Sequence, residues 1–115
     1  MNVLNLSFFA AVAAANPNGF TVNAFTGETP VNGYCVALSE TQNSFNDEGL
    51  KHVLRVIESG KTRAAFVGGW LDHETGLYYY DATIVTDNLQ DALTLAAANN
   101  QIAIFCLDNM QEIRL

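Results

Sequence analysis

Residues 64–85 read AAFVGGWL, DHETG and LYYYDATIV, and this stretch decides the fold. Its two outer arms are rich in β-branched and aromatic residues, which strands favour, and the polar segment from Asp72 to Gly76 has the composition of a turn. We therefore predict an antiparallel hairpin with strands at 64–71 and 77–85. The remaining elements are expected to pack around it.

Two further strand pairs are predicted on either side of this hairpin. Residues 20–25 and 33–38 have strand composition and flank a turn at 26–30, so they predict a first hairpin. Residues 101–107 and 112–115 predict a last one. Because residues 101–107 are apolar at both parities, they are typical of a central strand that is covered on both sides.

Three helices are predicted to alternate with the hairpins. Ser7 can cap the first, Ser44 or Asn46 can cap the second, which ends at Gly60, and Asp87 can cap the third. The second helix is expected to bury Leu50, Val53, Leu54 and Ile57, and the third Leu89, Ala92, Leu93 and Ala96. The chain is thus predicted to be a single α+β domain over residues 1–115, with helices packed on a mainly antiparallel sheet.

The composition excludes several classes of protein. Half of the 115 residues are hydrophobic and 15% are charged, which is unlike a disordered chain. A net charge of −7 disfavours nucleic acid and anionic membranes as partners, and no run is long enough to span a bilayer. The first cation is Lys51, so the apolar start is interpreted as a helix of a cytoplasmic protein and not as a secretion signal. Four of the five cations lie between Lys51 and Arg63, so any anionic partner is expected to approach near the second helix.

The residues that could carry chemistry are few. Cys35 and Cys106 lie in apolar runs and are interpreted as buried hydrophobes, with a disulfide or a reactive thiol as alternatives. His73 lies in a polar turn, and His52 is expected to pair with Glu48 on the surface of the second helix. The sequence predicts no metal site, no cofactor and no catalytic residue, so it favours a binding protein over an enzyme that uses His73 or Cys35.

Two features are candidate binding sites. The first is a polar run before the second helix, where outward N–H groups can hold a carboxylate or a phosphate: Glu40, Thr41, Gln42, Asn43 and Ser44. A well-capped loop is the alternative for this run. The second is an aromatic group on the central hairpin, beside two glycines that permit close approach of a backbone or a ligand: Trp70, Tyr78 and Tyr80.

Several short motifs resemble those of small acidic proteins carried by bacteriophages and bacterial mobile elements. They are Gly33-Tyr34, ETQNSF at 40–45, GGW at 68–70, YYYD at 78–81 and NQIAIF at 100–105. The resemblance implies no catalytic residues. It implies a non-enzymatic accessory protein in the cytoplasm of a bacterial host, of a kind that often blocks host defence.

Two functions follow as expectations. The first is that the protein binds a bacterial protein through its aromatic and polar surface and inhibits host defence, in the manner of anti-CRISPR or anti-restriction proteins. The alternative is that it sequesters a small anionic or nucleotide-like signal molecule at residues 40–44. The apolar strand at 77–85 is also compatible with a homodimer.

Overall fold

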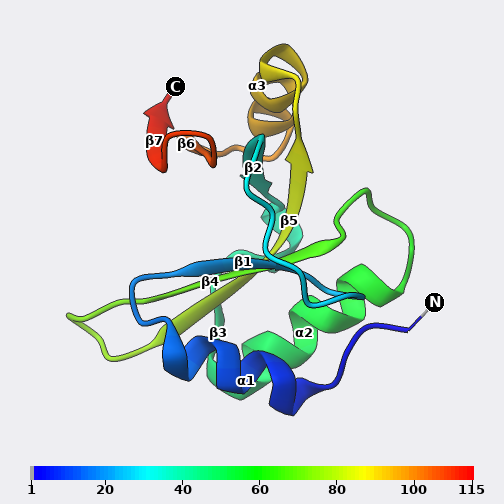
Figure 1. Cartoon of the computed structure of the whole chain (residues 1–115), viewed down its shortest axis with the longest axis vertical. Coiled ribbons are helices and arrows are strands. Elements are labelled where there is room, and N and C mark those ends of the chain that lie inside the picture. Colours follow the sequence, from blue (N-terminus) through cyan, green and yellow to red (C-terminus); the bar gives the residue numbers. More distant parts are fainter. Residues whose placement is uncertain (1) are drawn as a thin grey trace.

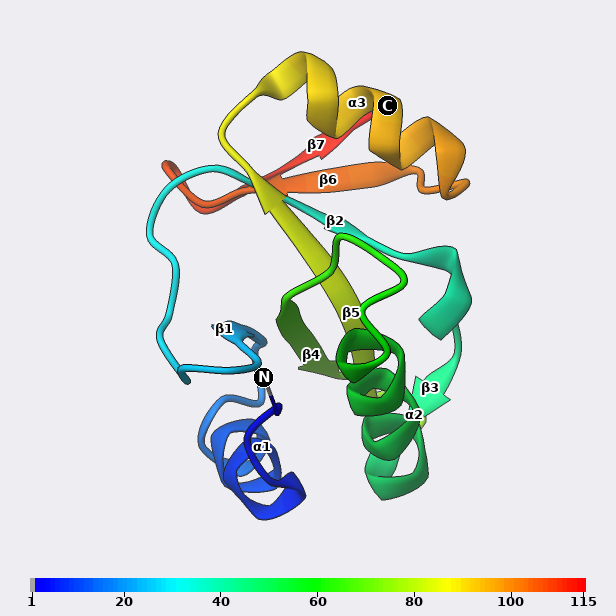
Figure 2. The same cartoon turned by 90° about the vertical axis from the view of Figure 1, so that its right-hand side faces the viewer.

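The computed structural model describes residues 2–115, which form three α-helices, one short 3₁₀ helix and a seven-stranded antiparallel sheet (Figures 1 and 2). The helices are α1 (Leu6–Ala15), η1 (Ser39–Thr41), α2 (Asn46–Glu58) and α3 (Leu89–Ala98). The strands are β1 (Phe20–Asn23), β2 (Tyr34–Ala37), β3 (Ser44–Phe45), β4 (Phe66–Leu71), β5 (Tyr78–Thr86), β6 (Ala103–Cys106) and β7 (Gln111–Arg114). The predicted α+β class, with helices packed on an antiparallel sheet, is confirmed.

The long strand β5 organises the sheet, whose order is β1-β4-β5-β2-β6-β7. One edge of β5 pairs with β4, and its other edge pairs first with β3 and then with β2. The central hairpin is confirmed, with a register that runs from Phe66 opposite Thr83 to Leu71 opposite Tyr78. The last hairpin is also confirmed, because β6 pairs with β7. Figure 2 shows β5 crossing the molecule diagonally from α2 towards α3.

The predicted first hairpin is wrong. β1 pairs with β4, and β2 pairs with β5 and β6. The turn residues close only a local loop, in which the Asn23 N–H donates to the carbonyl of Glu28 at 2.8 Å and the Asn23 side chain accepts the N–H of Phe25. The chain then leaves this loop and crosses to the other half of the sheet. Val22 of β1 is buried in the hydrophobic cluster under α1 and α2, whereas Val36 of β2 is buried in a second cluster under α3. The two strands therefore belong to different parts of the core and do not pair.

The helix caps differ from the prediction by one or two residues. Asn5, and not Ser7, caps α1, with its side-chain oxygen accepting the N–H of Phe8 at 2.9 Å. Asn88, and not Asp87, caps α3. Asn and Asp compete closely with Ser for such positions, so local composition does not separate neighbouring candidates. None of the helices in residues 2–115 is long and apolar enough to cross a membrane.

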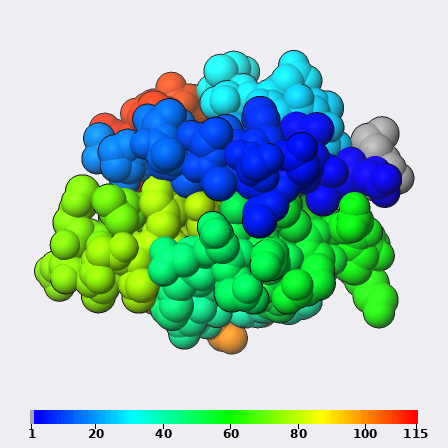
Figure 3. Space-filling model, turned by 90° about the horizontal axis from the view of Figure 1, so that it is seen from below, coloured from blue at the N-terminus to red at the C-terminus, as the bar shows by residue number. Residues whose placement is uncertain are grey.

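All three described α-helices pack on the same face of the sheet. Helices α1 and α2 cover β1, β4 and β5, and α3 covers β2 and β6 (Figure 1). Figure 3 shows α1 and α2 side by side across the lower surface of the molecule. The predicted stripe of α2 is confirmed, since Leu50, Val53, Leu54 and Ile57 are all buried. On α3 the small residues Ala92 and Ala96 are buried, whereas Leu89 is 43% exposed.

Strand alternation then defines the opposite face, which we call the open face. Successive side chains of a strand point to opposite sides of the sheet. On β5 the buried residues Tyr80, Ala82 and Ile84 point towards the helices. The odd-numbered residues of β5 therefore point to the open face, together with their cross-strand partners: Tyr79 with Trp70, Asp81 with Gly68, and Thr83 with Phe66 and Ala37.

Candidate functional site

The polar run at 40–44 completes the edge of β5. After β2 ends, the Leu38 N–H donates to the Ala82 carbonyl at 2.9 Å. The Thr41 hydroxyl then accepts the Ala82 N–H at 3.0 Å and donates to the Leu38 carbonyl at 3.3 Å. Thr41 is 1% exposed. Its hydroxyl therefore takes the place of a strand backbone group at the junction between β2 and β3.

The asparagines of this region shape the backbone. Asn43 and Asn46 have φ values of 63° and 54°, in the left-handed region that Asn tolerates better than most residues. Between them Ser44 is buried against β5. Asn46 does not cap α2 but accepts the N–H of Tyr78 at 3.1 Å. At Gly49 a β-carbon would lie 2.2 Å from the carbonyl carbon of Ser44, so this glycine lets α2 pack directly on β3.

His52 of α2 contacts the backbone of the same region. Its Nε2 lies 3.0 Å from the carbonyl oxygen of Glu40, so the predicted pairing of His52 with Glu48 is wrong. Glu48 pairs with Lys51 instead, at 3.3 Å. The hydroxyl of Thr41 and the carbonyl of Glu40 are thus used within the fold, whereas the side chains of Glu40 and Gln42 are exposed and face outwards.

The aromatic residues predicted as a binding group are divided between the two faces. Tyr80 is 5% exposed in the core, and Tyr78 on the same face donates its hydroxyl to the Asn16 carbonyl at 2.7 Å. Burial raises the pKa of Tyr78 to about 12. Trp70 points to the open face, where its ring stacks on Tyr79 with a centroid distance of 4.8 Å and an interplanar angle of 20°. Trp70 is 46% exposed and is the member of the group that borders a cavity.

The two glycines of β4 make room for side chains on opposite faces. A β-carbon on Gly69 would lie 2.5 Å from the ring of Phe20 and 2.7 Å from that of Tyr78, inside the core. A β-carbon on Gly68 would lie 2.8 Å from a carboxylate oxygen of Asp81, on the open face. The predicted close approach at these glycines is therefore made by side chains of the protein itself.

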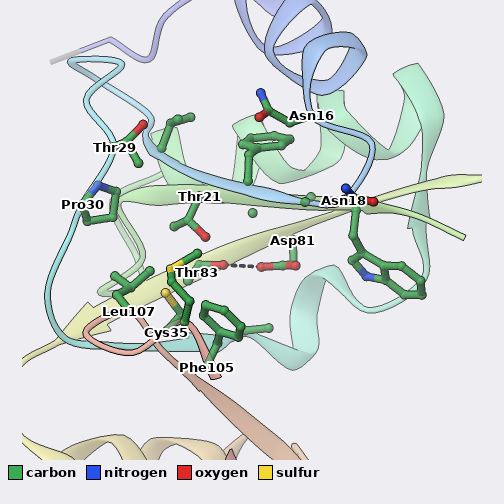
Figure 4. Close-up of a pocket in the computed structure, with 18 of the residues that line it drawn as sticks. Asn16, Asn18, Thr21, Thr29, Pro30, Cys35, Asp81, Thr83, Phe105 and Leu107 are labelled. Carbon is green, nitrogen blue, oxygen red and sulfur yellow. Dashed lines mark hydrogen bonds between the residues drawn. The ribbon is translucent and has the colours of Figure 1, made fainter. Parts of the chain in front are cut away.

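A pocket of about 780 Å³ lies on the open face (Figure 4). Five strands contribute its floor, and the labelled side chains converge there from β1, β2, β5 and β6: Thr21, Cys35, Asp81, Thr83 and Phe105. The rim comes from the end of α1 and the turn that follows it, from the loop between β1 and β2, and from the β6–β7 hairpin: Val12, Asn16, Asn18, Thr29, Pro30, Val31, Leu107, Met110 and Glu112. Pockets of 300 to about 1,000 Å³ with mostly apolar walls are the usual size and character of small-molecule sites.

Asp81 is the charged group at the centre of the floor. It is half-buried, and the Thr83 hydroxyl donates a hydrogen bond to its carboxylate, as Figure 4 shows. Burial raises the pKa of the Asp81 carboxyl above its ordinary value, while the bond from Thr83 acts in the opposite direction. A carboxylate has about four lone-pair positions, so one bond from Thr83 leaves acceptor capacity to spare.

The two cysteines have different surroundings. Cys106 is buried on the helix-covered face, as predicted, whereas Cys35 is half-buried and lines the pocket. Both thiols are free. Burial raises the pKa of Cys35 to about 11. A hydrogen bond from the Thr21 hydroxyl acts to lower this pKa, and the charge of Asp81 acts to raise it. The Cys35 thiol is therefore protonated at neutral pH.

Other groups that the sequence singled out lie apart from the pocket floor. His73 is exposed in the β4–β5 turn, where Asp72 accepts the N–H of Glu74 at 3.0 Å. Among the cations expected to form a basic surface, Arg63 is paired with Asp91 at 3.0 Å. Within residues 2–115, no cluster of three or more His, Cys, Asp or Glu residues could hold a metal ion.

Of the floor residues, sequence reasoning selected none as a binding residue. A signal for Asp81 is present in the stretch that decides the fold. It is a lone charge within an otherwise apolar or neutral strand, and hairpin pairing places it opposite a glycine. The contributions of Thr21 and Phe105 depend on which distant strands become neighbours, so no local pattern could reveal them.

Comparisons of this chain with protein-family models, with curated proteins and with solved structures found no match.

Proposed function

We propose that the protein is a non-enzymatic binding protein whose open-face pocket takes a small organic molecule. The observation that carries this proposal is the half-buried Asp81 carboxylate at the floor of a 780 Å³ cavity. Burying a charged group costs free energy unless a partner compensates for it. Such a group facing a cavity of ligand size is a typical means of orienting a bound molecule.

The composition of the walls supports the same proposal. A small number of polar groups, from Thr21, Cys35, Asp81 and Thr83, converge among apolar side chains such as Phe105. The chemistry of Cys35 favours binding over covalent catalysis, because a cysteine nucleophile acts as the thiolate. With a pKa of about 11, Cys35 holds its proton at neutral pH.

The proposal is tested by filling the pocket. Ala37 lines the cavity, and Ala14 is an exposed residue of α1 that provides a matched control. A library of small molecules is screened by thermal shift and by NMR against the wild type, Ala37→Phe and Ala14→Phe. We expect binders to raise the Tm of the wild type and of Ala14→Phe but not of Ala37→Phe. Equal binding by Ala37→Phe would place the ligand elsewhere and contradict the proposal.

A second candidate function is the binding of a bacterial protein, as the phage resemblance implies. The observation in its favour is that three exposed apolar side chains stand around the pocket: Val31 at 72%, Trp70 at 46% and Met110 at 68% exposure. A partner can insert one side chain into the cavity and cover these residues, since Trp is common in interface hot spots. Inhibition of host defence and a homodimer stay predictions.

This candidate is tested by co-purification of bacterial proteins with the wild type and with the double variant Trp70→Ala/Met110→Ser, each expressed in a bacterial host. We expect one stoichiometric partner that the variant loses. A partner retained by the variant would mean that this rim does not form the interface.

A further inference from the structure

The charges that line the pocket are all of one sign. Two carboxylates, Asp81 and Glu112, belong to the lining, and among residues 2–115 no Lys, Arg or His side chain lines it. The whole chain has twelve acidic and five basic residues, so its overall charge reinforces this local field. An anionic ligand would therefore be repelled from the cavity.

The two carboxylates differ in how they are compensated. Glu112 lies at the rim on β7, where it accepts a hydrogen bond from Arg114 at 3.0 Å. Asp81 lies at the floor, and its partner Thr83 is a neutral hydroxyl. Among residues 2–115, Asp81 is thus the acid of this pocket that has no cationic partner.

The surroundings of Asp81 define the rest of the ligand. Gly68 leaves the space that the carboxylate occupies, since a β-carbon there would lie 2.8 Å from Asp81 Oδ1. Figure 4 shows the apolar side chains of Phe105 and Leu107 on the β2 and β6 side of this carboxylate. A polar head at Asp81 would therefore be attached to a body that lies on an apolar wall.

We infer that the pocket binds an organic cation, with a protonated amine against Asp81 and an aromatic or aliphatic body against Phe105 and Leu107. This inference rests on the proposed function and names the ligand class of that site. It differs from the expectation of an anionic ligand at 40–44, a run in which the buried hydroxyl of Thr41 is bonded within the fold. A charge-assisted hydrogen bond to a carboxylate is stronger than a neutral one.

The test compares ligands that differ only in the head group. Matched sets of a primary amine, an alcohol and a carboxylate, built on phenylethyl, indolylethyl and hexyl bodies, are titrated into ¹⁵N-labelled protein at pH 7. The chemical shifts of Gly68, Asp81 and Phe105 report binding in the pocket. We expect the Kd of each amine to be lower than that of its alcohol by about tenfold or more. The carboxylates are expected to have the highest Kd values.

Two variants assign the preference to one residue. Asp81→Asn keeps the shape and the acceptor for Thr83 but removes the charge, whereas Glu112→Gln removes the other acid of the pocket as a matched control. We expect Asp81→Asn to lose the amine preference and Glu112→Gln to keep it. Amine selectivity that survives in Asp81→Asn would overturn the assignment.

The two proposals fail in different ways. If alcohols or carboxylates bind the wild type as tightly as the amines, the inference of an organic cation is wrong but a small-molecule site remains. If no member of any set shifts the pocket resonances at millimolar concentration, both proposals are overturned. The wild-type comparison needs no variant, so it stands even where a substitution perturbs the fold.

Discussion

Gly68 and Asp81 are cross-strand partners on the open face, and the missing side chain of the glycine provides the space for the carboxylate. Its neighbour Gly69 provides space for Phe20 and Tyr78 on the other face. The two adjacent glycines therefore serve the pocket and the core separately. Alanine substitutions distinguish these roles.

We predict that Gly69→Ala destabilises the protein by about 1–3 kcal/mol, because the new methyl group overpacks two core rings. Gly68→Ala is expected to cost less, because the carboxylate of Asp81 can turn towards the cavity and alanine is less flexible than glycine in the unfolded chain. Urea unfolding measures both values. A Gly68→Ala variant as unstable as Gly69→Ala would show that the Asp81 side chain cannot move.

Asp81→Asn is predicted to increase stability at neutral pH. Burial raises the folded-state pKa of Asp81, so the folded protein holds this proton to a higher pH than the unfolded chain, whose Asp pKa is about 3.9. The free energy of unfolding therefore falls as pH rises from about 4 through the folded pKa. Asn has no such proton, so the advantage of the variant should grow over that window and then level off.

The measurement is urea unfolding of the wild type and Asp81→Asn between pH 3 and pH 8. The other titratable groups of the pocket are Cys35 on β2, which titrates near pH 11, and Glu112 on β7. Repeating the comparison in a Glu112→Gln background removes the second carboxylate. A stability difference that shrinks as pH rises would contradict the prediction. A gain in stability together with a loss of amine binding is the pattern expected of a functional residue.

Thr41 is predicted to be essential for the β2–β3 junction. Thr41→Val preserves the shape but leaves the buried N–H of Ala82 without its hydroxyl acceptor, at a cost of about 1–3 kcal/mol. Thr41→Ser keeps that acceptor and loses one methyl group, worth about 0.8 kcal/mol. Equilibrium unfolding should rank serine above valine. Equal stabilities would show that the hydroxyl contributes little.

The reactivity of Cys35 is predicted to depend on Asp81. With a pKa of about 11, the thiol should react slowly with iodoacetamide at pH 7, and the rate should rise about tenfold for each unit by which the pH is increased towards that pKa. Because the charge of Asp81 raises this pKa, Asp81→Asn should react faster at the same pH. Mass spectrometry follows the modification in a Cys106→Ala background, which leaves Cys35 as the reporter. An unchanged rate would mean that the two groups are not coupled.

The fold could be predicted from the sequence where its contacts are local. The β4–β5 hairpin has a short polar turn between strand-forming arms, and the stripe of α2 from Leu50 to Ile57 repeats at helical spacing. The pairing of β1 with β4 could not be predicted in this way. It joins segments that are far apart along the chain, and the local turn after β1 gives no information about it.

The candidate site was harder to predict because the same residue types serve two purposes. In the run at 40–44, the hydroxyl of Thr41 and the left-handed backbone of Asn43 build a strand junction, yet in sequence they resemble the donors and acceptors of a ligand site. Asp81 lies in a stretch whose strand propensity predicts a hairpin and gives no indication of a binding site. Its role follows only from strand parity, which places it on the face opposite the helices.

The lining of the pocket extends along the chain from Val12 to Glu112. Partial chains emerging from the ribosome, or fragments left by a protease, therefore lack part of the cavity wall. Ligand capture would report that the chain has been synthesised and folded at least as far as Glu112. A ligand present in the cell would also protect molecules that have the whole lining from degradation, because it binds the folded state and not its fragments.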